Sequence, residues 1–189
     1  MADQQAGRDG LREEIVGKEP CFEGRLIRVE QWRVRLPDGS HAYREAVLHP
    51  GAAAVVAVDE CGLVALVRQH RVVVDEVMLE IPAGKLDHAG EDPLACARRE
   101  LREETGLSAA RWRLLTTMHP APAFCNERVA LYLATGLTEG AARLDEGEFL
   151  RVERMPLAEA VSLVLAGALR DGKTALGLLM AQRALGDTI

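Results

Sequence analysis

Residues 80–107 read EIPAGKLDHAGEDPLACARRELREETGL, and this stretch decides the fold expected for the rest of the chain. Its second half carries the signals of one helix. Asp92 can cap the first free amides, Pro93 suits the first helical position, and Gly106 suits the residue after the last turn. The sequence therefore predicts a loop that leads into a helix over 93–105.

The predicted helix has an acidic face. Glu100, Glu103 and Glu104 follow i, i+3, i+4 spacing and should project together from an exposed patch, while Leu94, Ala97 and Leu101 share another face. Like charges at this spacing destabilise a helix by about 0.2–0.5 kcal/mol per pair. One interpretation is a solvated charged face, because Arg98, Arg99 and Arg102 can neutralise the acids across helical turns and Arg99 with Glu103 is an i, i+4 pair.

The alternative interpretation is a metal site. Clustered carboxylates supply the hard oxygen ligands that Mg²⁺ or Mn²⁺ prefers. A tight turn at Pro82-Ala83-Gly84 would bring backbone close to such an ion, because glycine tolerates conformations that other residues avoid. The carbonyl oxygen of Ala83 is therefore a further candidate ligand.

The order of residues resembles the Nudix box, G-x5-E-x7-R-E-U-x-E-E-x-G-U, in which U is aliphatic. The residues that fall in their places are Glu91, Arg99, Glu100, Leu101, Glu103, Glu104, Gly106 and Leu107. Gly84 precedes Glu91 by one residue more than the pattern allows, and the extra residue falls in the LDHAG segment before the helix. The acidic register is thus intact, and only the path of the loop departs from the family.

The resemblance implies a ligand set. In the family, the carbonyl at Ala83 and the acids at Glu100 and Glu104 bind Mg²⁺ or Mn²⁺, with Glu103 nearby and with more than one ion per site. The acid that activates water lies on a late loop, which matches Glu148, with Glu146 as the alternate. Glu103 is a third candidate for this catalytic role.

Segments outside the box resemble the ADP-ribose pyrophosphatase branch of the Nudix hydrolases. YREAVLHPGAAAVVAV and LVRQHR match its strands, and Pro122 stands at the offset typical of ADP-ribose substrates, although PAPAF departs from the usual S-P-G. The resemblance places substrate contacts at Arg44, Arg71 and Glu127. Arg71 would clamp phosphate, and Arg44 would reach from one subunit of a homodimer into its partner's site.

The implied activity is hydrolysis of ADP-ribose to AMP and ribose 5-phosphate. One alternative keeps the chemistry and changes the substrate to another nucleotide sugar such as GDP-mannose. An alternative of a different class is an ADP-ribose-binding sensor that has lost catalysis. Such a sensor would be expected to lose a metal acid, whereas every box acid is present.

Composition excludes other classes. A net charge of −6 disfavours non-specific binding to nucleic acid. The four cysteines are far apart without a C-x-x-C pair, which argues against structural zinc and predicts reduced, packed thiols. The sequence has no 18-residue apolar run and no basic-then-apolar leader, so we expect a soluble cytoplasmic protein without a membrane contact.

The rest of the chain predicts an α/β protein with a mixed sheet covered on both faces, as in the α/β/α Nudix sandwich. Residues 1–14 should be a flexible tail. Residues 15–48 should form a small antiparallel β segment that is too small to be stable alone and takes part in dimerisation. Residues 49–189 should form the Nudix domain, with a hairpin around Asp59-Glu60-Cys61-Gly62 and two helices near the end.

Overall fold

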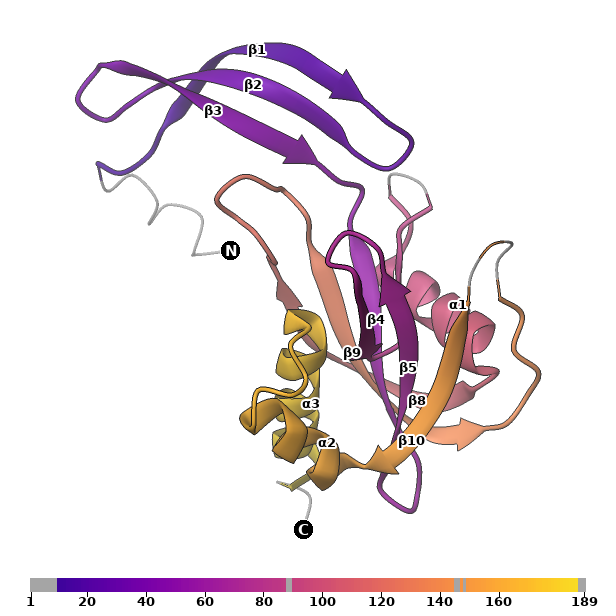
Figure 1. The fold of residues 1–189 in the computed structure, drawn as a ribbon. Helices are drawn as coiled ribbons and strands as arrows, with labels where there is room; N and C mark the ends of the chain where they lie inside the picture. The colour runs from indigo at the N-terminus through magenta and orange to yellow at the C-terminus, as the bar shows by residue number, and fades with distance from the viewer. Residues whose placement is uncertain (1–9, 88–89, 145–146, 148, 187–189) are drawn as a thin grey trace. The chain divides into compact units, whose positions relative to one another are not determined.

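The computed structural model describes residues 10–87, 90–144, 147 and 149–186. Contacts divide the chain into two units. The smaller unit contains the chain up to Pro50 together with Ala121–Glu127, and the larger unit contains Gly51–Pro120 and the chain from Arg128 onward (Figure 1). The two units are described separately below.

The smaller unit is a three-stranded antiparallel sheet in the order β1 (Glu14–Glu23), β2 (Arg28–Arg35), β3 (His41–Leu48). A turn joins β2 to β3, and in it Asp38 Oδ1 accepts hydrogen bonds from the Ser40 amide at 2.9 Å and from the Ser40 hydroxyl at 2.6 Å. The flexible tail predicted over 1–14 falls largely outside the described residues, and its last residue, Glu14, begins β1.

A distant segment completes this sheet. The Val47 amide donates to the Phe124 carbonyl at 2.7 Å, and the Asn126 amide donates to the Val47 carbonyl at 3.1 Å. The Asn126 side chain also accepts from the His49 amide at 2.8 Å. Residues 121–127 therefore belong with the N-terminal segment, which differs from the expectation of one continuous domain over 49–189.

The larger unit is built on a seven-stranded sheet in the order β10-β5-β4-β9-β8, with β6 paired to β5 and β7 paired to β4. β4 and β9 are parallel and the other pairs are antiparallel, so the predicted mixed sheet is confirmed. The strands are β4 (Ala52–Val58), β5 (Leu63–Arg71), β6 (Glu76–Glu80), β7 (Ala83–Lys85), β8 (Ser108–Met118), β9 (Val129–Thr138) and β10 (Leu150–Pro156).

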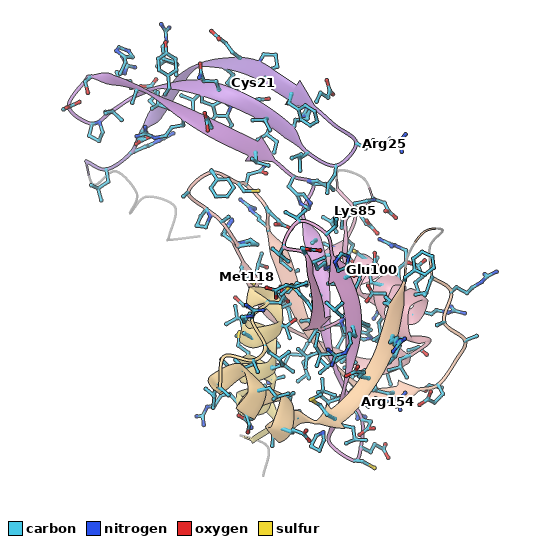
Figure 2. All side chains as sticks on the ribbon, in the orientation of Figure 1. Cys21, Arg25, Lys85, Glu100, Met118 and Arg154 are labelled. Carbon is cyan, nitrogen blue, oxygen red and sulfur yellow. The ribbon has the colours of Figure 1, made fainter. Side chains whose placement is uncertain are left out.

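Helices cover both faces of this sheet, and the alternation of side chains along β4 explains how. Ala53, Val55 and Ala57 pack with the first helix, α1 (Pro93–Thr105), whereas Ala54, Val56 and Val58 pack with α2 (Leu157–Leu165) and α3 (Gly172–Gly186). Figure 1 shows α1 on one side of the sheet and α2 with α3 on the other, and Figure 2 shows the side chains that fill the space between them. The expected α/β/α sandwich is thus confirmed.

One edge of β4 is shared by two strands. β5 pairs with β4 only at Ala57 and Val58, and β7 pairs with its other end, at residues 52–54. Between them the Val55 amide donates to the Pro82 carbonyl at 2.9 Å. The chain segment Pro82-Ala83-Gly84 is therefore held at the sheet, where it meets α1.

The helix that bears the acids has the predicted limits and caps. Asp92 Oδ1 accepts from the Leu94 amide at 3.2 Å, and Gly106 adopts the left-handed conformation with φ of 74°. Gly106 is required for a second reason, because a Cβ at this position would lie 2.5 Å from the Gly140 carbonyl oxygen. Both ends of α1 are thus fixed by residues that sequence alone identifies.

Two further expectations concern composition. The expectation that the cysteines are packed is wrong for Cys21 and Cys61, which are exposed, whereas Cys96 is buried. In the described residues, no helix has the length and apolar character needed to cross a membrane.

Candidate active site

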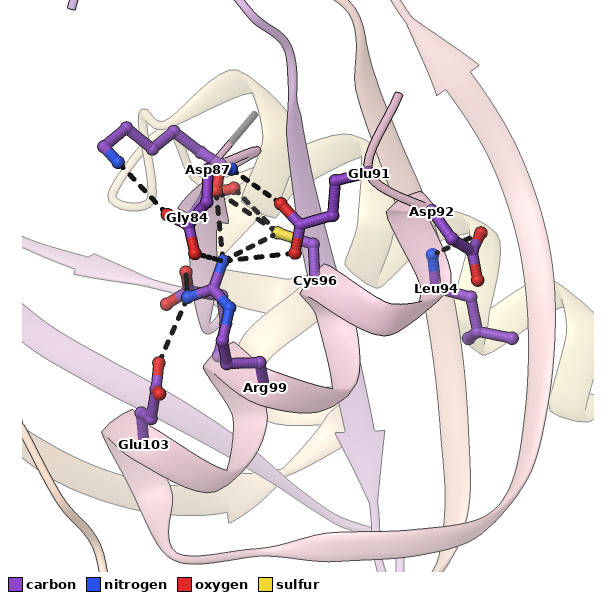
Figure 3. Close-up of polar contacts among 10 residues, drawn as sticks. Gly84, Asp87, Glu91, Asp92, Leu94, Cys96, Arg99 and Glu103 are labelled. Atoms are coloured by element: carbon purple, nitrogen blue, oxygen red, sulfur yellow. Dashed lines mark hydrogen bonds and ion pairs between the residues drawn. The ribbon is translucent and has the colours of Figure 1, made fainter. Parts of the chain in front are cut away.

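Arg99, in the middle of α1, is the centre of a charged cluster. Its Nη1 donates to Glu100 Oε1 at 2.6 Å and to Glu103 Oε2 at 3.1 Å, which confirms the predicted i, i+4 pair. Its Nη2 donates to the Lys85 carbonyl at 3.3 Å and lies 3.3 Å from Asp87 Oδ2 and 3.7 Å from Glu91 Oε1. Figure 3 shows how this guanidinium ties the helix to the loop before it.

These contacts hold charge in a confined space. Burial alone would lower the pKa of Arg99, but the charge of Glu100 and the hydrogen bonds to Glu100 and Glu103 raise it overall. The buried Cys96 thiol lies below the same guanidinium, and burial raises its pKa to about 12. Cys96 therefore stays a neutral thiol that donates to the Lys85 carbonyl at 3.4 Å, and it supplies no ligand anion.

Strand β7 lies close against α1 at Gly84. A Cβ built on this residue would lie 1.9 Å from Glu100 Oε1 and 2.0 Å from Glu100 Cδ. Only glycine permits this approach, because any side chain would occupy the place of the carboxylate. Figure 2 labels Lys85, which follows Gly84 in β7, and Glu100 on α1.

Glu104 reaches the same loop one turn further along α1. Its Oε2 accepts from the Ala83 amide at 3.1 Å, and the residue is only 3% exposed. The expectation that the acids project from an exposed patch is therefore wrong for Glu104, because the helix turns this face toward the sheet and the loop. A buried carboxylate must be compensated, and one amide supplies part of that compensation.

The acids do not already form a complete cation cage. Among residues 10–87, 90–144, 147 and 149–186, no group of three or more His, Cys, Asp or Glu side chains converges in a way that could hold an ion. Arg99 explains this arrangement, since it is hydrogen-bonded to Glu100 and Glu103. The donor set nevertheless fits a hard divalent ion: two carboxylates of α1 meet the backbone of Ala83 and Gly84, and the missing Cβ of Gly84 leaves room for oxygen atoms there.

A basic cavity lies beside Glu103. It has a volume of about 810 Å³ and is lined by Arg98, Arg99, Arg102, Glu103, Ala141, Arg143 and Leu144. The Arg98 guanidinium lies 5.7 Å from the centre of the Trp112 ring, and the Arg143 amide donates to the Glu103 carbonyl at 2.9 Å. Of the three arginines expected to neutralise the acids, only Arg99 pairs with them in the described residues.

Arg71, the predicted phosphate clamp, ends β5 in the same unit. It is hydrogen-bonded to the buried carboxylate of Glu80, with Nε to Oε1 at 2.7 Å and Nη2 to Oε2 at 2.8 Å. Sequence analysis overlooked Glu80. The signal was present, since a charged residue at the end of the apolar strand VMLEIP has to be paired when it is buried.

The other predicted substrate contacts lie in the smaller unit. Arg44 and Pro122 line one cavity of about 360 Å³, which also contains the side chains of Trp32 and Phe124. Arg44 Nη2 donates to Glu13 Oε1 at 2.5 Å. Glu127 lies outside this set of lining residues, with its Oε1 3.5 Å from His49 Nδ1.

Glu146 and Glu148, the predicted water-activating acids, lie outside the described residues, as does Asp145 between them and Leu144. The described chain leads into this segment beside Glu103, because Arg143 is bonded to the Glu103 backbone and Leu144 lines the same cavity. The assignment of the base among these acids therefore stays a prediction.

Replacement of Gly84 by alanine tests the contact between loop and helix. The new Cβ must displace the Glu100 carboxylate, which is the movable end of a side chain, so we expect a change of less than about 1 kcal/mol in unfolding free energy. Mn²⁺ affinity, measured by electron paramagnetic resonance, should fall at least about tenfold. Gly186→Ala is the control, since nothing lies within 4 Å of a Cβ there. Unchanged Mn²⁺ affinity in Gly84→Ala would show that Glu100 does not bind the ion.

Comparison with known proteins places this arrangement in a family. The NUDIX domain model matches residues 47–184. The chain is 41% identical to an ADP-ribose pyrophosphatase of Bacillus subtilis, over 87% of this chain and 90% of that protein. It is 38% identical to a methanol dehydrogenase activator of Bacillus methanolicus, over 93% of this chain and 96% of that protein. A crystal structure of an ADP compounds hydrolase superposes with a TM-score of 0.82 at 23% identity, over 94% of this chain and 97% of that one. The chain therefore belongs to the NUDIX domain family and is a Nudix hydrolase.

Proposed function

We propose that this protein hydrolyses the diphosphate bond of ADP-ribose and releases AMP and ribose 5-phosphate. The observation that carries the proposal is the convergence of Glu100 and Glu104 on the Ala83-Gly84 backbone, with Arg71 on the neighbouring strand of the same unit. Hydrolases of the family generally require a divalent metal ion. The similarity to an ADP-ribose pyrophosphatase over most of the chain supports this substrate.

Glu100, Glu104 and the Ala83 carbonyl would hold Mg²⁺, with Mn²⁺ as the alternative, and Glu103 would complete the site for a further ion. When bound, the metal supplies neutralisation of the diphosphate charge and lowers the pKa of a coordinated water. Glu100 has to exchange its bond with Arg99 for this role. The Arg99 guanidinium then remains bonded to the Lys85 carbonyl and to Glu103, so it continues to hold the loop against the helix.

The substrate's phosphates carry negative charge, and the larger unit presents cations to receive it. The Arg71 side chain is 40% exposed, so an anion in solution can reach it. The arginine-lined cavity beside Glu103 adds positive potential, which favours the approach of an anion to an otherwise acidic protein. Hydrolysis forms a bond from water oxygen to phosphorus and breaks the bond to the bridging oxygen, and the proton of the water passes to a carboxylate.

We assign that carboxylate to Glu148, with Glu146 as the alternate. The support is the position of the preceding residues, since Arg143 and Leu144 bring the chain to the Glu103 side of the acidic helix. A general base has to lie within hydrogen-bond reach of the attacking water. Glu103 is the remaining candidate if neither loop acid acts.

The cavity of the smaller unit is proposed to bind another part of the nucleotide. Trp32 and Phe124 offer apolar surface for a base, and Arg44 offers a donor to ribose or phosphate oxygens. We also propose a homodimer formed through this unit, in which Arg44 serves the partner's site. A three-stranded sheet with exposed Ile15, Phe22 and Tyr43 buries too little apolar surface to be stable alone, and a second copy would cover it.

Substrate choice is tested by kcat/KM under one Mg²⁺ concentration for ADP-ribose, ADP-glucose, GDP-mannose, NADH and diadenosine polyphosphates. We expect the highest value for ADP-ribose. A value at least about tenfold higher for another compound, equivalent to about 1.4 kcal/mol, would overturn the substrate assignment and leave the family activity. Tight binding of ADP-ribose without any turnover would instead favour the sensor.

Replacement of Arg44 by alanine tests the role of the smaller unit. We expect KM for ADP-ribose to rise about tenfold or more with little change in the thermal unfolding temperature, because Arg44 is exposed and pairs only at the surface. Arg35→Ala is the matched control, since Arg35 pairs with Glu14 on the same sheet but does not line the cavity. A monomer by light scattering at micromolar concentration that retains full activity would refute the dimer proposal.

Replacement of Glu148 by glutamine tests the general base. We expect kcat to fall about 10²–10⁴-fold with little change in Mn²⁺ affinity, because the substitution removes the proton acceptor and leaves the ligands of α1. Glu146→Gln is assayed beside it, and Glu139→Gln is a control on the loop that begins this segment. If both Glu146→Gln and Glu148→Gln retain nearly wild-type kcat, the assignment moves to Glu103.

A further inference from the structure

The carboxylate of Glu80 is buried at the point where three elements of the larger unit meet. Glu80 is 2% exposed and ends β6, immediately before the loop that carries Ala83 and Gly84. It receives the two hydrogen bonds from Arg71 at the end of β5. Lys173, in the first turn of α3, donates to its Oε2 as well. The mechanism proposed above gives this carboxylate no role.

A second link joins the same elements. The Ile81 amide, next to Glu80, donates to Thr174 Oγ1 at 2.9 Å, and Asp171 Oδ2 accepts from Lys173 Nζ at 2.9 Å and from the Thr174 amide at 3.0 Å. The two positive charges of Arg71 and Lys173 thus balance the two negative charges of Glu80 and Asp171. Because Lys173 is shared between Glu80 and Asp171, the Glu80 carboxylate remains compensated even when Arg71 is engaged elsewhere.

Glu80 remains ionised under ordinary conditions. Burial alone would raise the pKa of its carboxyl group, but the hydrogen bond from Arg71 and the charge of Lys173 outweigh that effect and lower the pKa to about 2. The hydrogen bonds to Glu80 raise the pKa of Arg71, and the charge of Glu104 adds to this effect against the opposing desolvation. Arg71 therefore lies within electrostatic reach of a carboxylate of the acidic helix.

The geometry of the pair is asymmetric. Nε and Nη2 of Arg71 face Glu80, and in the part of the chain that the structure describes Nη1 makes no hydrogen bond. The Glu80 side chain is buried, whereas the Arg71 side chain is 40% exposed. A buried ion pair is by itself weak evidence for a role in stability. The arrangement instead fixes one edge of a planar group and leaves the other edge open.

We propose that Glu80 is a positioning residue for the hydrolysis, which holds the Arg71 guanidinium by one edge so that the other edge receives a phosphate oxygen of the substrate. This inference rests on the proposed function and assigns a residue to it. A bidentate contact suits the task, because it removes the rotation of the guanidinium before the substrate arrives and so lowers the cost of binding. Lys173 supports the same carboxylate from α3.

A double-mutant cycle tests the proposal with Glu80→Gln, Arg71→Ala and the combination of both. The measurements are KM and kcat for ADP-ribose with Mg²⁺, the Kd for ADP-ribose without metal in the presence of EDTA, and the thermal unfolding temperature. We expect Glu80→Gln to raise KM and the metal-free Kd at least about tenfold. The double variant should lie within about threefold of Arg71→Ala, because Glu80 acts through Arg71 and has nothing left to position once that side chain is gone.

Glu153→Gln is the matched control. Glu153 forms the same kind of pair with Arg68, with distances of 2.5 Å and 3.0 Å, on β10 and β5. We expect Glu153→Gln to leave KM and Kd unchanged.

Arg71→Lys is a second test, which does not replace a buried residue. Lysine keeps the positive charge, but it cannot form two parallel hydrogen bonds to Glu80 and still offer a free edge to the substrate. We therefore expect KM to rise in Arg71→Lys as it does in Glu80→Gln.

Four outcomes would overturn the positioning role. The first is a wild-type KM in Glu80→Gln, and the second is a wild-type KM in Arg71→Lys. The third is additive losses in the double variant, which would show that Glu80 acts independently of Arg71, for example through stability. The fourth is a wild-type protein that neither binds nor cleaves ADP-ribose, which overturns the proposed function as well and is visible without any variant.

Discussion

The site depends on the close approach of the Gly84 backbone to the Glu100 carboxylate. The Pro82 carbonyl and the short strand β7 are bonded to β4, and α1 packs over β4 by Ala97 and Leu101. The distance between loop and helix is thus set by the core, and glycine is the one residue that leaves room for the carboxylate.

Charge compensation is arranged in two layers around that contact. On the helix side, Arg99 joins the acids to the Lys85 carbonyl, so the cluster is stable without a ligand. On the sheet side, Glu80 is held between Arg71 and Lys173. In the proposed function, the carboxylates on the helix side would receive the cation, and Arg71 on the sheet side would receive the anionic substrate. Each layer offsets the cost of burying its carboxylates.

Much of this was predictable from sequence for a physical reason. The helix limits follow from Asp92, Pro93 and Gly106, and the register of the acids follows from the helical repeat. The burial of Glu104 was not predictable, because it depends on where the Ala83 amide lies after the sheet forms. The pairing of residues 121–127 with β3 and the link from Glu80 to Lys173 join segments far apart in sequence, and no local pattern specifies such contacts.

We propose that Glu100 and Glu104 hold the catalytic metal beside the backbone of Ala83 and Gly84. The most direct test is kcat of Glu100→Gln and of Glu104→Gln toward ADP-ribose at saturating Mg²⁺, with thermal unfolding measured on the same samples. The account predicts a folded protein in each case with less than about a tenth of the wild-type kcat, a loss of more than about 1.4 kcal/mol in transition-state stabilisation. A folded variant that retains more than this fraction would contradict the assignment of its acid as a metal ligand.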